Sequence, residues 1–152
     1  MGQIISLETK EGHEYLIKLD IINPDILPVV MEIPVVNITI ERVSDKQETN
    51  NARTLFQIAN AIRNYADQND VILYCYCDSA PILKRDQNLL NQEFRSKLFM
   101  KMFEKQNSDE YLNEQIIVDD PDNGKHYIHL FSKVHNKEII EVIASKLNEY
   151  NK

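Results

Sequence analysis

The architecture that we predict depends on one apolar run, Val71-Ile72-Leu73-Tyr74-Cys75-Tyr76-Cys77. The run is apolar at consecutive positions, which is typical of a short central strand that other elements cover on both faces. It stands between two segments in which apolar residues recur with helical spacing. A strand between two helices predicts crossover connections, with helices packed on the faces of a sheet.

The segments outward from this run predict the remaining elements. Residues 52–68 have the period of an amphipathic helix, and the apolar positions 90, 94, 98 and 102 indicate a second helix that ends near Lys105. Alternation of apolar and polar residues predicts strands at 3–7, 14–19, 35–43, 115–118 and 127–131, and Ile139, Ile140, Ile143 and Leu147 indicate a C-terminal helix. The pair Asn123-Gly124 predicts a hairpin between the last two strands. We therefore expect an α+β fold with three helices, a mainly antiparallel mixed sheet and the order β-β-β-α-β-α-β-β-α.

Length and composition predict one domain, spanning residues 1–152, that folds by itself. Hydrophobic residues make up 43% of the chain and charged residues 27%, which suits a globular domain. The net charge of −7 disfavours general affinity for nucleic acid or an anionic membrane. No stretch approaches the roughly 20 apolar residues of a membrane span. We expect a cytoplasmic protein with no membrane association.

The order of elements from the third strand onward is similar to the topology of the Gcn5-related N-acetyltransferases. Arg95, Leu98, Phe99, Lys101 and Phe103 stand where that superfamily has a characteristic helix. The resemblance implies a coenzyme A site, built from a glycine-rich turn and a tyrosine. Here the corresponding turn, residues 46–51, contains no glycine and adds a carboxylate, and Phe99 replaces the tyrosine. We therefore expect a degenerate donor site and no bound cofactor.

The chain also resembles a family of small Bacteroidetes proteins that carry a domain of unknown function. The matching pattern is Tyr74, Cys77, Asp78 and Ser79, followed by Arg95, Leu98, Phe99 and Phe103. The match extends over residues 15–150. It implies a bacterial, cytosolic protein and no particular chemistry.

The histidines and acidic residues predict no metal site. His126 and His129 are three positions apart on a predicted strand, so their imidazoles should point to opposite faces and cannot share one ion. Asp120, Asp122 and Gly124 resemble the start of a calcium loop, but its distal glutamate is missing, so we expect a solvated hairpin turn. His13 and His135 have no partner that the sequence reveals.

The two cysteines lie on one face of the predicted central strand. Cys75 and Cys77 should lie roughly 6–7 Å apart, and we expect no disulfide between them and a reducing compartment. Their neighbours Tyr74, Tyr76 and Asp78 should raise the thiol pKa values. We therefore expect buried structural cysteines.

The candidate binding site combines the carboxyl end of the central strand with the following helix, and its residues are Asp78, Ser79, Arg95, Lys97 and Lys101. Residues 83–105 contain six basic and three acidic residues within an acidic chain, which favours docking of an acidic partner, either a protein or a short nucleic acid. In the alternative, structural interpretation, Arg95 pairs with Asp78 or Glu93 on an ordinary solvated helix.

These features predict a non-catalytic binding or accessory protein of immunity type that recognises another macromolecule. The alternative is an acyltransferase-like enzyme with a degenerate or altered acyl-donor site. A nucleic-acid binder has only the local basic helix in its favour. A splayed pair of central strands with an open groove would favour the transferase, and a filled groove would favour binding.

Overall fold

The computed structural model describes residues 2–8, 14–23, 33–42, 52–77, 88–104, 110–122 and 124–149. Within these ranges the chain forms six strands and three helices, and a short 3-10 helix at Val134–Asn136. The elements are β1 (Gly2–Glu8), β2 (Glu14–Ile21), β3 (Val35–Arg42), α1 (Ala52–Gln68), β4 (Ile72–Cys77), α2 (Asn91–Glu104), β5 (Tyr111–Asp120), β6 (Gly124–Lys133) and α3 (Lys137–Asn148). The predicted order of strands and helices is confirmed.

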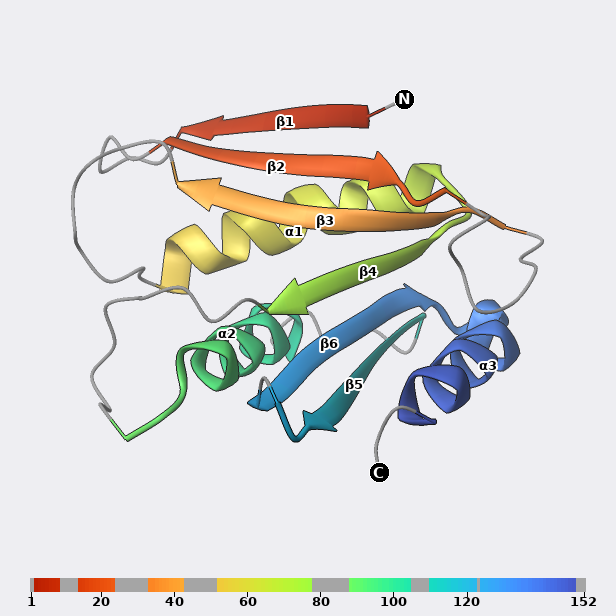
Figure 1. The fold of residues 1–152 in the computed structure, drawn as a ribbon. Coiled ribbons are helices and arrows are strands. Elements are labelled where there is room, and N and C mark those ends of the chain that lie inside the picture. The colour runs from red at the N-terminus through yellow and green to blue at the C-terminus, as the bar shows by residue number, and fades with distance from the viewer. Residues whose placement is uncertain are drawn as a thin grey trace.

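The strands form one mixed sheet in the order β1-β2-β3-β4-β6-β5 (Figure 1). Strands β1, β2 and β3 form an antiparallel meander, β3 and β4 pair in parallel, and β6 lies antiparallel to both β4 and β5. The predicted α+β fold with a mainly antiparallel sheet is confirmed, and β4 lies in the middle of the sheet as predicted.

The parallel strands β3 and β4 pair only at their amino-terminal ends. Their three pairs are Val35 with Ile72, Val36 with Leu73 and Asn37 with Tyr74. The two strands then diverge toward their carboxyl ends (Figure 1). As a result, the second half of β4, which carries both cysteines, has β6 as its paired neighbour among the described strands.

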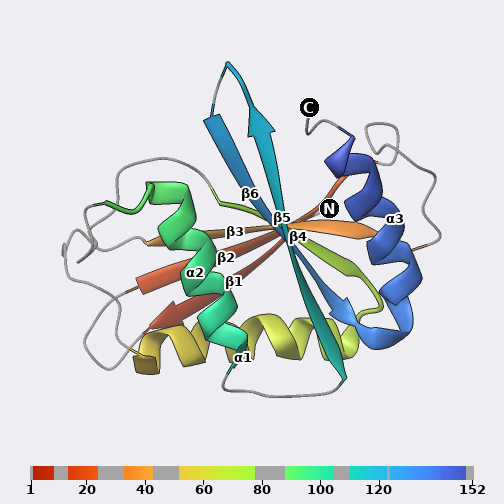
Figure 2. The same cartoon turned by 90° about the horizontal axis from the view of Figure 1, so that it is seen from below.

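Two hydrophobic layers cover the two faces of the sheet. Helices α1 and α2 lie on one side and α3 on the other (Figure 2). Leu73 of β4 packs in the layer beneath α1, whereas its neighbour Ile72 packs in the layer beneath α3. Both side chains are fully buried, so the prediction of a two-sided central strand is confirmed. No helix in the described ranges is both long enough and apolar enough to cross a membrane.

The hairpin between β5 and β6 sets the register of the strands that carry the histidines. Gly124 has a φ of 87°, a conformation that favours glycine, and the N–H of Asp122 donates to Oδ1 of Asp120 at 2.9 Å. The predicted turn is confirmed, although Asn123 lies outside the described residues. Both strands are longer than predicted, and β5 begins at Tyr111.

Candidate functional site

A row of polar side chains crosses the face of the sheet beneath α2. Cys75 on β4 lies opposite His129 on β6, and His129 lies opposite Gln115 on β5. Residues paired in register point to the same face of a sheet, so these three side chains are neighbours. The adjoining positions Leu73 and Phe131 are apolar and buried. His129 therefore lies within an apolar layer, where its ring nitrogens need hydrogen-bond partners, whereas Gln115 on the edge strand is exposed.

Ser96 of α2 supplies the central partner of this row. Its hydroxyl lies 2.7 Å from Nε2 of His129, and it accepts a hydrogen bond from the side-chain amide of Gln115 at 2.6 Å. On the other side of the ring, Nδ1 of His129 lies 3.0 Å from Oδ1 of Asn113. These contacts join α2, β5 and β6 in one polar cluster.

The hydrogen bonds define the protonation of His129. Because the Asn113 oxygen only accepts, Nδ1 of His129 carries the proton, and Nε2 accepts the hydroxyl hydrogen of Ser96. The order hydroxyl, imidazole, amide resembles the relay that activates a serine nucleophile. However, Ser96 and His129 are both 0% exposed, so a substrate cannot reach the Ser96 oxygen in this structure.

Asn113 retains one unpaired donor beside this ring. Its Nδ2 is the buried side-chain nitrogen for which the described part of the chain offers no partner. A buried donor of this kind typically costs about 1–3 kcal/mol. The cluster therefore combines a well-paired imidazole with a side chain that is held at an energetic cost.

Cys77 lies close to the same histidine. Its side chain is 3% exposed, whereas Cys75 is half-buried, and both cysteines are free. A hydrogen bond from the Cys75 thiol lowers the pKa of Cys77 to about 6, and His129 and the positive charge of Arg95 act in the same direction. These effects outweigh burial, which by itself would raise the pKa of this thiol.

The prediction that the surroundings raise the thiol pKa is therefore wrong for Cys77. It considered the sequence neighbours Tyr74 and Tyr76, but alternate residues of a strand point to opposite faces. The groups that lower the pKa are Cys75, two positions away on the same face of β4, together with His129 of β6 and Arg95 of α2. Asp78, the third expected neighbour, lies outside the described residues.

The predicted binding residues of α2 lie on different sides of the helix. Lys97 and Lys101 are exposed and one turn apart, whereas Arg95 is half-buried and acts on Cys77. The margin position expected for Arg95 agrees with its half-buried side chain. Asp78 and Ser79 lie outside the described residues, so the structure does not test whether they join Arg95.

A second cluster lies at the end of β4 on the opposite face. The Tyr76 hydroxyl lies 2.6 Å from Nδ1 of His126, and Nε2 of His126 lies 3.3 Å from Oδ2 of Asp120. The predicted opposite orientation of His126 and His129 is confirmed, because His129 belongs to the buried cluster beneath α2. Tyr76 is 43% exposed, so this second cluster lies at the surface of the hairpin.

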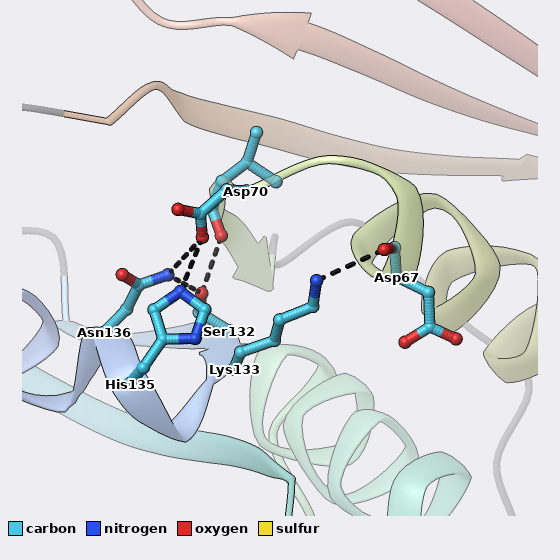
Figure 3. A network of polar contacts seen from close by, with 7 residues as sticks. Asp67, Asp70, Ser132, Lys133, His135 and Asn136 are labelled. Carbon is cyan, nitrogen blue, oxygen red and sulfur yellow. Dashed lines mark hydrogen bonds and ion pairs between the residues drawn. The ribbon is translucent and has the colours of Figure 1, made fainter.

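A third network joins the start of β4 to the region before α3 (Figure 3). Asp70 Oδ1 accepts from Nδ2 of Asn136 and lies near Nε2 of His135, both at 2.9 Å. The sequence reveals no partner for His135, and the structure supplies Asp70, which is 65 residues away in the sequence. Ser132 donates to the Val71 carbonyl at 2.6 Å. This network anchors α3 and is structural.

The described residues contain no group of three or more histidine, cysteine or acidic side chains that could hold a metal ion. In the hairpin, Oδ1 of Asp120 already accepts the N–H of Asp122, as in an ordinary turn. The geometry therefore offers hydrogen-bonding and thiol chemistry.

Three members of the polar cluster around His129 are not among the residues that the sequence predicts as a site: Ser96, Asn113 and Gln115. The signals that the sequence does contain are the same-face spacing of Cys75 and Cys77 and a histidine in a later strand. Only the strand register shows that these groups meet.

Comparisons of this chain with protein-family models, with curated proteins and with solved structures found no match. The two resemblances drawn from the sequence therefore remain predictions. Function has to be inferred from the chain's own residues.

Proposed function

We propose that this chain is a non-catalytic accessory protein of immunity type that binds an acidic protein through the outer face of α2. We define the outer face of α2 as Lys97, Met100 and Lys101. The observation that carries the proposal is that two exposed lysines one turn apart flank a methionine that is 41% exposed. Cations beside an exposed methionine suit a protein partner with acidic and apolar groups.

The composition of this face favours a protein over a nucleic acid. Two lysines would neutralise about two phosphates, which supports only weak binding of a polyanion to a chain with a net charge of −7. Leu90, which precedes α2, is 48% exposed and adds apolar surface near the helix. Apolar surface contributes to a protein interface and contributes little to phosphate contacts.

Burial of Ser96 and His129 argues against a hydrolytic role for this pair. The serine and histidine that resemble a hydrolytic relay are fully covered, and Phe99 packs against the histidine with ring centroids 4.8 Å apart. A reaction at the Ser96 oxygen would require α2 to leave the sheet.

The test is capture of a partner from a lysate of the native host by the immobilised chain, followed by affinity measurements with the purified partner. Lys97→Glu combined with Lys101→Glu should weaken binding by about tenfold or more at low salt, and the loss should shrink as salt rises. The matched control is Lys137→Glu combined with Lys146→Glu on α3, which changes the net charge equally on the other side of the sheet. Equal affinities for the two double variants would contradict the proposal, as would loss of capture after nuclease treatment.

One observation favours the second candidate, an acyltransferase-like enzyme with an altered donor site. The parallel strands β3 and β4 diverge after three pairs, the arrangement expected for a transferase of that topology. Against it, Phe99 is 3% exposed, packs within the core and has no hydroxyl, so it supplies no proton. Residues 46–51, the expected phosphate turn, lie outside the described residues.

Calorimetric titration with acetyl-coenzyme A separates the two candidates. We expect no heat of binding, because the turn lacks glycine and Phe99 lacks a hydroxyl. A micromolar dissociation constant, which corresponds to a binding free energy of about −8 kcal/mol, would favour the acyltransferase-like enzyme over the binding protein.

A further inference from the structure

The buried cluster contains two thiols beside an imidazole whose position is restrained on both sides. Cys75 and Cys77 point to the same face of β4, and Cys75 lies directly opposite His129. His129 is held by Ser96 at one nitrogen and by Asn113 at the other. This pair of thiols lies beneath α2 and is separate from the docking surface proposed above, which lies on the outer side of that helix.

The hydrogen bonds around His129 allow the ring to carry a positive charge. Its Nδ1–H already donates to Asn113, and a proton added at Nε2 would donate to the Ser96 oxygen. A hydroxyl can change from donor to acceptor by rotating, so no side chain has to move to another position. The cluster can therefore hold an imidazolium next to a thiolate.

Arg95 adds a second positive charge near the sulfur. The described charged and titratable groups that bear on this site are Cys75 on β4, Tyr127 and His129 on β6, and Glu93 and Arg95 on α2. Glu93 acts on Tyr127, which lies opposite Cys77. The groups that act on the sulfur itself, Cys75, His129 and Arg95, each favour its ionised form.

We propose that Cys77 is a nucleophile toward hydroperoxides and that Cys75 is the thiol that resolves the oxidised product. The Cys77 thiolate attacks the distal oxygen of the hydroperoxide, and the O–O bond breaks as the S–O bond forms. The leaving alkoxide takes the proton that His129 received from the thiol, which gives an alcohol and a sulfenic acid. Cys75 then attacks the Cys77 sulfur, an S–S bond forms, and hydroxide leaves with the Cys75 proton as water. Two thiols have lost two electrons to one hydroperoxide.

Exposure and spacing favour this class of reagent. Because Cys77 is only 3% exposed, a small hydroperoxide can reach its sulfur far more readily than an acyl donor with a large carrier. Residues two apart on a strand are separated by roughly 6–7 Å between Cα atoms, near the upper limit for a disulfide. A disulfide formed there would be strained and easily reduced, so the oxidation would be reversible.

The test is oxidation of the reduced full chain by hydrogen peroxide in the presence of dimedone, followed by intact mass measurement. Wild type should lose two hydrogen atoms in mass and carry no dimedone. Cys75→Ser should carry one dimedone on Cys77, and Cys77→Ser should react no faster than free cysteine. Equal reactivity of the two single variants would overturn the proposal, as would a dimedone adduct on Cys75.

The pH dependence provides a second measurement on folded protein. The oxidation rate of the wild-type chain should reach half its maximum near pH 6, where Cys77 ionises with Cys75 beside it, far below the roughly 8.5 of a free thiol. A midpoint near that of free cysteine would overturn the proposal, because the cluster would then not activate the sulfur.

Discussion

Ser96 on α2 and His129 on β6 are joined by a hydrogen bond of 2.7 Å, although 33 residues separate them in the sequence. The bond lies in a layer that is otherwise formed by apolar side chains such as Phe99 and Met102. In such a layer an unpaired polar atom costs more than a formed hydrogen bond contributes. The pair therefore holds α2 in one position on the sheet.

Replacement of this hydroxyl should lower the free energy of unfolding. Ser96→Ala leaves Nε2 of His129 and the amide of Gln115 without their shared partner, and we expect a loss of about 1–3 kcal/mol in urea denaturation at neutral pH. The matched control is Ser145→Ala on the exposed side of α3, where a change below about 0.5 kcal/mol is expected. Similar losses in the two variants would show that the buried hydrogen bond contributes little.

Asp70 should make stability dependent on acid pH. Its contacts with Asn136 and His135 hold the pKa of the Asp70 carboxyl below its usual range. For a carboxyl with a lowered pKa, the stabilisation is fully present above the unfolded pKa, about 3.9, and is lost as the pH falls through the lower folded value. In thermal melts of the wild type, the destabilisation that comes from protonation of Asp70 should therefore appear only below about pH 4.

Asp70→Asn should remove this part of the acid dependence. Melting temperatures of wild type and of the variant should converge as the pH falls and differ most at neutral pH. Asp122→Asn, at an exposed position of the hairpin turn, should leave the acid dependence as in wild type. Parallel curves for Asp70→Asn and wild type would contradict the role assigned to this carboxyl.

Asp120 should restrain the tip of the β5–β6 hairpin. Its two oxygens accept from the Asp122 N–H and contact His126, so Asp120→Ala removes both contacts. Loss of about 1.4 kcal/mol of local stability corresponds to roughly tenfold faster amide hydrogen exchange at the turn. Asp122→Ala keeps the backbone N–H and should leave exchange nearly unchanged. Equal exchange rates in both variants would mean that the turn residues alone hold the tip.

The local elements of this chain could be predicted from the sequence, because their signals lie within a few residues. The period of 3.6 predicts α1 with the bounds Ala52–Gln68 that the structure has, and the two-sided run predicts the central strand β4. The Asn-Gly pair likewise predicts the last hairpin. In each case the relevant residues are neighbours along the chain.

The contacts of the candidate site could not be predicted, because they join residues that are distant in the sequence. That Cys75 lies opposite His129 depends on the register of β4 with β6, which no local pattern specifies. Asn113 lies in a part of β5 that the alternation of apolar residues did not indicate. The error over the Cys77 pKa has in part the same origin, since two of the groups that lower it, His129 and Arg95, come from other elements.

Arg95 should distinguish the two proposals made for this protein. Its side chain is half-buried and acts on Cys77, whereas Lys97 is about 200° further around the helix and faces outward. Arg95→Ala should therefore raise the pH at which the oxidation rate of Cys77 reaches half its maximum, because a positive charge near the thiolate is lost. Partner capture by the outer face of α2 should persist. Arg95→Lys should restore most of the pH midpoint, since it keeps the charge.

The same variants give opposite results if the assignments are wrong. Loss of capture in Arg95→Ala, with an unchanged melting temperature and an unchanged oxidation midpoint, would assign Arg95 to the docking surface. Lys97→Glu combined with Lys101→Glu is the reciprocal control: it should weaken capture in a salt-dependent manner and leave the oxidation midpoint near its wild-type value, because exposed charges on the far side of the helix are screened. A shift of that midpoint as large as the one in Arg95→Ala would mean that the general charge of α2, and not the position of Arg95, sets the ionisation of Cys77.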